Sequence, residues 1–112
     1  MKIAIPTVNG CLCMHFGHCE KFVFVEVDAA AKSVIGTSEA VPPPHEPGVL
    51  PKWLHEQQVN VIIAGGMGMR AQQFFNEYGI EVVVGAPAEK PDTVARNWMN
   101  GTLVTGGNVC DH

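Results

Sequence analysis

The fold is decided by residues 59–71, which read VNVIIAGGMGMRA. The first six residues are almost continuously apolar, which is typical of a strand buried on both faces of a parallel sheet. Glycines then interrupt the run, and the apolar residues beyond them recur at the spacing of one helical face: Met67, Ala71, Phe74 and Tyr78. A buried strand followed directly by an amphipathic helix predicts an α/β protein with a right-handed crossover.

Working outward from this stretch, the same patterns predict the other elements. Strands are expected at residues 3–5, 22–27, 33–40 and 80–84, with Pro6 ending the first of them. Helices are expected from Val49, with Pro51 in the first turn, and from Pro91 to Gly101. The order is therefore β-β-β-α-β-α-β-α. It predicts a five-stranded mixed sheet flanked by helices, because the opening hairpin adds antiparallel strands to the parallel pairs.

Length and composition restrict the class of protein. The 112 residues, 46% of them hydrophobic, predict a single globular domain over residues 1–112. The net charge is −4, and the seven lysines and arginines are scattered, so no basic face for nucleic acid is expected. No apolar run is long enough for a membrane span. The N-terminus reads as a strand without a signal peptide, which predicts a cytoplasmic protein with reduced thiols.

Residues 11–19, CLCMHFGHC, concentrate five soft or borderline metal ligands between the first two predicted strands. The five are Cys11, Cys13, His15, His18 and Cys19. Thiolate and imidazole groups suit copper, zinc and iron–sulfur chemistry. The turn-forming pair Asn9-Gly10 opens this loop and helps it to bend back. Alternatively, the three cysteines are small buried hydrophobic residues and Phe16 anchors the loop in the core.

The glycine loop Gly65–Gly68 offers a second candidate site. It follows a buried strand and opens a helix, where backbone N–H groups attract anions, and Arg70 adds a positive charge. The loop matches neither GxGxxG nor a Walker sequence, so nucleotide binding is disfavoured. Alternatively, it is only a tight turn that requires positive φ. We expect this loop and the His15 loop to lie side by side at the carboxyl ends of their strands.

Two further groups of potential ligands lie near Pro-rich or terminal sequence. Cys110 and His112 form a C-terminal Cys-x-His, which either folds over a site or frays into solvent. His45 lies in a proline-rich connector and is most simply a surface residue. The sequence does not favour a hydrolytic enzyme, because no cluster of carboxylates is expected at the strand ends.

With these residues in view, the sequence resembles the dinitrogenase iron–molybdenum cofactor biosynthesis family over essentially its whole length. The resemblance rests on residues 15–18, on residues 63–71 and on residues 106–112. The proline-rich residues 42–48 resemble the subgroup near the orange protein, which carries a molybdenum–copper sulfide cluster. The resemblance implies a ribonuclease H-like α/β fold and a non-enzymatic protein that binds, stores or carries a metal–sulfur cluster. Proteins that donate or accept the cluster are the implied partners.

The residues and the resemblance together define the predicted site. The resemblance makes His15 the first expected ligand, whereas the cysteine ligands are inferred from this sequence alone. The expected metal ligands are His15, Cys11, Cys13, Cys19, Cys110 and His112. The expected cluster-binding residues are His15, Phe16, Gly17, His18, Gly65, Gly66, Met67, Gly68 and Arg70. The metal is left open between molybdenum–copper sulfide and iron–sulfur types. The alternatives are a redox-active thiol protein without metal and a small-molecule or nucleotide-binding protein that uses the glycine loop.

Overall fold

A computed structural model describes residues 1–14, 19–28, 30–43 and 48–106. The elements are β1 (Lys2–Val8), β2 (Cys11–Leu12), β3 (Lys21–Asp28), β4 (Ser33–Ala40), α1 (Val49–Glu56), β5 (Val61–Ile63), α2 (Met69–Glu77), β6 (Glu81–Val83) and α3 (Pro91–Met99). The strands form one mixed sheet in the order β4-β3-β1-β5-β6, and β2 adds a short sixth strand beside β1. The predicted ribonuclease H-like class and the five-stranded path are confirmed. The sixth strand lies inside the predicted ligand loop.

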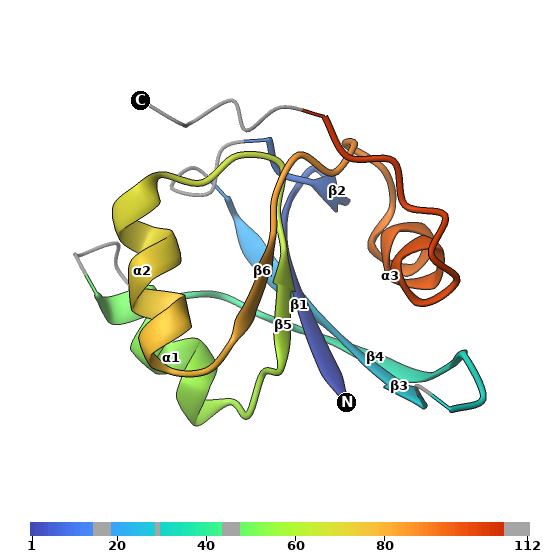
Figure 1. The fold of residues 1–112 in the computed structure, drawn as a ribbon, viewed down its shortest axis with the longest axis horizontal. Coiled ribbons are helices and arrows are strands. Elements are labelled where there is room, and N and C mark those ends of the chain that lie inside the picture. Colours follow the sequence, from blue (N-terminus) through green and yellow to red (C-terminus); the bar gives the residue numbers. More distant parts are fainter. Residues whose placement is uncertain (15–18, 29, 44–47, 107–112) are drawn as a thin grey trace.

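The sheet combines an antiparallel and a parallel half. β1 pairs with β3 antiparallel, and β3 pairs in the same way with β4. On its other side β1 pairs in parallel with β5, and β5 pairs in parallel with β6. The carboxyl ends of β1, β5 and β6 therefore lie at one edge of the sheet, where the chain continues into loops (Figure 1).

Helices cover both faces of the sheet: α1 and α2 lie on one face, and α3 lies on the other (Figure 1). On the first face, Leu54 of α1 and Phe75 of α2 pack in one core cluster with Phe22 and Ile62. On the second face, α3 packs in another cluster through Val94 and Ala95, as its spacing predicts. In α2 the buried residue is Phe75, whereas Tyr78, expected on the core face, is 36% exposed. The ring of Tyr78 stacks on the ring of His55, and the two ring centroids are 4.8 Å apart.

Pro6 does not end β1, which continues to Val8. The carbonyl of Pro6 accepts a hydrogen bond from the N–H of Cys13, so its nitrogen faces the same side. β5 has already ended there, since its pairing with β1 covers only Ile3 and Ala4. The missing N–H of Pro6 therefore costs no bond to the main sheet, which is why the expected stop does not occur.

The Asn9-Gly10 pair forms the predicted turn. Val8 pairs with Cys11, so the turn has two residues, and φ is +53° at Asn9 and +81° at Gly10. Two positive φ values are those of the tight hairpin turn that matches strand twist and favours Asn-Gly. The turn reverses the chain, so that β2 runs back along β1 and brings Cys11 and Cys13 beside the sheet.

Candidate metal-binding site

The ligand loop and the glycine loop meet at the carboxyl edge of the sheet. A Cβ atom built on Gly65 would lie 2.7 Å from the Cα of Met14 and 3.2 Å from the carbonyl oxygen of Cys13. The two backbones are thus in direct contact, because β1 and β5 are parallel neighbours whose loops leave the sheet at the same edge. The expectation that these loops lie side by side is confirmed as far as Met14. His15, Phe16, Gly17 and His18 lie outside the described residues.

The glycine loop does not need positive φ, so its interpretation as a tight turn of that kind is wrong. Gly65, Gly66 and Gly68 are not among the positive-φ residues, and φ of Gly68 is −66°. Glycine is required at position 65 for space. Because Gly65 has no side chain, the backbone after β5 can touch the backbone of the ligand loop. The space that glycine provides is thus taken by the protein chain and not by a bound ligand.

A second contact between backbones lies next to the first. The N–H of Gly85, after β6, donates to the carbonyl of Gly65 at 2.6 Å. The N–H of Gly106 in turn donates to the carbonyl of Gly85 at 2.7 Å. Met14, Gly65, Gly85 and Gly106 therefore form a row along the carboxyl edge. This row places the segment that leads to the C-terminus beside the two loops (Figure 1).

The three described cysteines share one face of the sheet. Leu12 pairs with Thr7 and packs in the cluster beneath α3, so alternation turns Cys11 and Cys13 toward the opposite face. Cys19 packs against the cluster on that opposite face, which α1 and α2 cover. Cys13 is buried, whereas Cys11 and Cys19 are partly exposed. Alternation therefore assigns the three described thiols to the face that also holds Met67, but it does not bring them together as a metal site by themselves.

The Cys19 thiol is held in its protonated form. The pKa of Cys19 is raised from 9.0 to about 11, mainly because the thiol is buried and also because Cys13 lies nearby, while a hydrogen bond of the Cys19 backbone partly lowers it. Each cause is expected, because burial and a second negative charge both disfavour a thiolate. A metal ion that binds the sulfur of Cys19 must displace this proton.

The start of α2 supplies the groups of the glycine loop that a ligand can reach. Arg70 is exposed in the first turn, and no side chain caps the helix at Gly68. N–H groups and a guanidinium group at a helix start favour an anion. Met67, in contrast, is fully buried in the core cluster, so its thioether packs against apolar side chains.

The described residues alone do not complete a metal site. Within residues 1–14, 19–28, 30–43 and 48–106, no group of three or more Cys, His, Asp and Glu residues is arranged to hold a metal ion. The other predicted ligands, His15, His18, Cys110 and His112, lie outside the described residues, as does His45. The ligand set therefore stays a prediction, with its thiols placed on one face.

Sequence reasoning missed three positions of this edge. Gly85 follows an apolar strand sequence as Gly65 does, and that parallel was the available signal. Gly106 opens the C-terminal segment of the family resemblance, yet its contact with Gly85 depends on the fold. Glu20 accepts a hydrogen bond from the backbone of Asn9, and no sequence pattern indicates this.

These features define a small α/β protein whose soft-ligand loop, glycine loop and C-terminal segment meet at one edge of a mixed sheet. The family model described as dinitrogenase iron-molybdenum cofactor matches residues 1–101. The chain belongs to this family. In the described part of the chain, no helix combines the length and the apolar character that crossing a bilayer requires.

Individual relatives support the same fold. An uncharacterized protein of Methanocaldococcus jannaschii is 37% identical over 86 residues, which cover 73% of this chain and 72% of that protein. The crystal structure of PH0822 is similar with a TM-score of 0.85 at 29% identity, over 94% of both chains. The apo form of the orange protein from Desulfovibrio gigas has a TM-score of 0.73 at 20% identity, over 96% of this chain and 93% of that one. At that identity the last likeness shows the fold alone.

Proposed function

We propose that this protein binds, stores or carries a metal–sulfur cluster or its precursor as cargo, and that it catalyses no reaction itself. In this proposal residues 1–112 form one domain, which receives the cargo from a donor protein and passes it to an acceptor. Membership in the dinitrogenase iron-molybdenum cofactor family supports a role in cofactor assembly. The same fold occurs in the orange protein, whose solved structure is an apo form and which therefore also has a ligand-bound state.

The contact between Gly65 and the Met14 backbone carries the proposal. It joins a loop rich in soft ligands to a helix start with an exposed arginine. Metal–sulfide clusters are anionic and need both soft ligands for the metal and donors for the sulfides. The two kinds of group come from segments that are distant in sequence, and this contact brings the segments together.

The donor set fits such cargo. In the proposal His15 is the principal ligand, Cys11, Cys13 and Cys19 contribute thiolates, and Phe16, Gly17 and His18 line the cluster. The N–H groups at the start of α2, from Gly68 onward, and the side chain of Arg70 face its anionic surface, while the buried backbone of Gly65 holds the ligand loop beside them. Met67 is buried as a whole residue and its carbonyl accepts a hydrogen bond from the side chain of Gln72, so in the proposal it supports the loop from the core.

The C-terminal ligands are within reach of the same edge. Gly106 is hydrogen-bonded to Gly85, which is hydrogen-bonded to Gly65 beside Met14. Cys110 follows Gly106 by four residues, a span of at most about 14 Å in an extended chain. In the proposal Cys110 and His112 therefore contribute ligands to the same cluster.

The test is elemental analysis with a visible absorption spectrum of protein purified without oxygen and without a histidine tag. We expect molybdenum, copper or iron together with labile sulfide and charge-transfer bands, either directly or after reconstitution. The two reconstitution mixtures are tetrathiomolybdate with copper, and iron with sulfide. Colourless, metal-free protein that binds neither mixture contradicts the proposal. Reversible oxidation of its thiols would then favour a redox-active thiol protein.

Two variants test the roles of individual residues. His15→Ala should lower the cluster stoichiometry and change the spectrum, whereas His55→Ala should change neither, because His55 stacks on Tyr78 away from the loop. Arg70→Ala should weaken binding of tetrathiomolybdate with copper more than binding of zinc alone, since only the former is anionic. Arg96→Ala is the control for Arg70→Ala, because Arg96 lies on α3 and lines the groove between the sheet and that helix. Unchanged cluster binding in His15→Ala would remove His15 as the principal ligand.

A further inference from the structure

The ligand loop leaves and rejoins the sheet at neighbouring points of β1. After β2, the N–H of Cys13 donates to the carbonyl of Pro6 at 2.8 Å. Before β3, the N–H of Glu20 donates to the carbonyl of Thr7 at 2.8 Å. Successive carbonyls of a strand point to opposite sides, so the two ends of the loop lie on either side of β1. A tie between the ends must therefore pass around the end of this strand.

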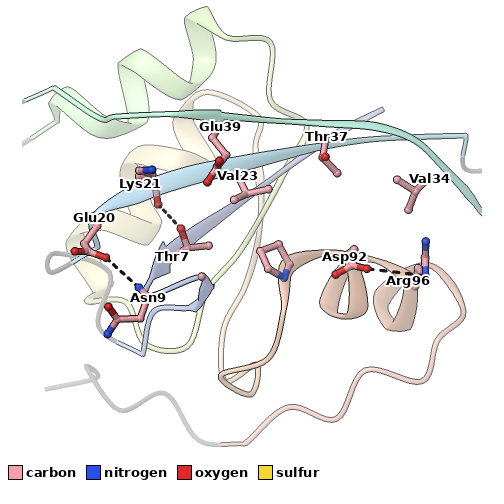
Figure 2. A pocket seen from close by; sticks show the side chains of 12 residues that line it. Thr7, Asn9, Glu20, Lys21, Val23, Val34, Thr37, Glu39, Asp92 and Arg96 are labelled. Carbon is pink, nitrogen blue, oxygen red and sulfur yellow. Dashed lines mark hydrogen bonds and ion pairs between the residues drawn. The ribbon is translucent and has the colours of Figure 1, made fainter.

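The side chain of Glu20 makes such a tie. Its Oε1 accepts the N–H of Asn9 at 3.0 Å, as Figure 2 shows. Asn9 lies two residues before Cys11, whereas Glu20 follows Cys19 directly. One carboxylate thus links the residues on both sides of the ligand loop. Asn9 has φ of +53°, a left-handed conformation that Asn adopts readily in such a turn, so the carboxylate reinforces a turn that the Asn-Gly sequence already favours.

The tie is connected to the thiols through β2. Leu12 is 1% exposed in the core cluster beneath α3, and its N–H donates to the carbonyl of Glu89 at 2.9 Å. Cys11 and Cys13 flank Leu12 and face the other way, so β2 cannot turn without moving all three side chains. The Asn9-Gly10 turn determines how β2 lies on β1, and Glu20 holds that turn.

We infer that Glu20 is a positioning residue, which fixes the Asn9-Gly10 turn and through it the orientation of the Cys11 and Cys13 thiols in the ligand loop. The inference rests on the proposed function for its purpose, since the orientation matters where these thiols bind cargo. Its structural content is independent of any metal. Glu20 also borders a groove of about 670 Å³ between the sheet and α3, so solvent reaches the tie from that side (Figure 2).

Three variants separate the acceptor from the charge of Glu20. Glu20→Ala removes both, and Glu20→Gln keeps an oxygen acceptor for the N–H of Asn9 while removing the charge. Glu39→Ala is the matched control, because Glu39 lines the same groove from β4, opposite Val23 and beyond β3 from the loop. Metal-free protein is used to measure amide hydrogen exchange at Asn9 and across β2. The rate at which a small thiol reagent modifies Cys11 is measured alongside.

Glu20→Ala should speed exchange of the Asn9 amide by about fivefold to tenfold, as expected for losing one charge-assisted hydrogen bond in a solvent-accessible place. The rate at which Cys11 is modified should change together with the exchange rate. Glu20→Gln should restore most of the wild-type value of each rate. Glu39→Ala should leave both rates as they are in the wild type. Wild-type rates in Glu20→Ala, or rates in Glu20→Gln equal to those in Glu20→Ala, would overturn the inference.

Zinc titration then connects the tie to binding. Glu20→Ala should bind zinc more weakly than the wild type, and Glu20→Gln should recover the affinity. Zinc affinity unchanged in Glu20→Ala despite faster exchange would overturn the positioning role. If the wild type binds neither zinc nor a cluster, the proposed function fails, and the exchange and thiol measurements still decide whether Glu20 holds the loop.

Discussion

Gly65 and Gly85 lie next to each other at the carboxyl edge of the sheet, yet glycine is required at the two positions for different reasons. Gly65 has no positive φ, and its constraint is the Met14 backbone at 2.7 Å from an added Cβ. Gly85 has φ of +82°, and an added Cβ would collide with the backbone of Gly106. Space alone requires glycine at the first position, whereas space and conformation both require it at the second.

The difference shows that the two backbone contacts constrain their glycines in different ways, although the N–H of Gly85 donates to the carbonyl of Gly65. The Gly65 contact holds the ligand loop, and the Gly85 contact holds the segment before the C-terminus. Two other glycines complete the comparison, because Gly79 has φ of +76° with open space around it and Gly36 has neither constraint. Substitution by alanine therefore separates the cost of conformation from the cost of contact.

Gly85→Ala should have the largest effect. We expect the free energy of unfolding to fall by about 3–4 kcal/mol, as a left-handed backbone costs alanine about 1–2 kcal/mol and a backbone clash costs a similar amount or more. Urea denaturation monitored by circular dichroism measures the loss. A loss of only about 1 kcal/mol would mean that the Gly106 segment moves away without cost, and that the second contact is weak.

Gly65→Ala should have an intermediate effect. The expected loss is about 2 kcal/mol, from the contact alone, because rigid backbone rather than a side-chain tip must give way. Amide exchange in residues 11–13 should rise with it, since the ligand loop is displaced. Gly79→Ala is the control and should cost about 1 kcal/mol through its conformation, with no change in exchange of the loop. Equal loop exchange in both variants would contradict the contact.

Alkaline pH should destabilise the protein through the buried Cys19 thiol of the ligand loop. The pKa of Cys19 is raised to about 11, so the folded state binds this proton more tightly than the unfolded state, whose value is near 9.0. The corresponding stability is present below pH 9 and is lost as the pH rises toward 11. The free energy of unfolding, measured from pH 8 to pH 11, should therefore decrease more steeply in the wild type than in Cys19→Ala. Parallel curves would show that the Cys19 thiol is not desolvated.

Cys13 should influence the same titration. Its sulfur is the second cause of the raised pKa of Cys19, so Cys13→Ala should lower the pH at which the Cys19 thiolate forms. Ultraviolet absorbance of the thiolate follows this titration directly. An unchanged midpoint in Cys13→Ala would indicate that the two thiols do not face each other across the loop.

Gly36→Ala should have the smallest effect. Gly36 lies in β4 with no atom within 4 Å of an added Cβ and without positive φ. The free energy of unfolding should stay within about 0.5 kcal/mol of the wild type. A larger loss would show that glycine substitution in this sheet is costly in itself, and the values for Gly65 and Gly85 would have to be corrected by that amount.

The elements of the fold were predictable because their signals are local. The apolar run before Gly65, the helical spacing after it and the glycine and proline breaks each depend on residues within a few positions. Pro6 was misread, because its effect depends on which neighbouring strand its nitrogen faces. The inward side of α2 was predicted only in part: Met67 and Ala71 pack in or against the core as expected, but the buried aromatic residue is Phe75 rather than Tyr78. A regular spacing fits two adjacent faces equally well.

By itself, the sequence determined the α/β class, the order of the elements and the set of soft ligands, because periodicity and residue chemistry are properties of short stretches. Only the tertiary structure decided that three thiols share one face, that Gly65 is required by the Met14 backbone and that Glu20 joins the two ends of the loop. Each of these depends on contacts between segments that are distant in the chain. Such contacts exist only once β1 lies between β3 and β5.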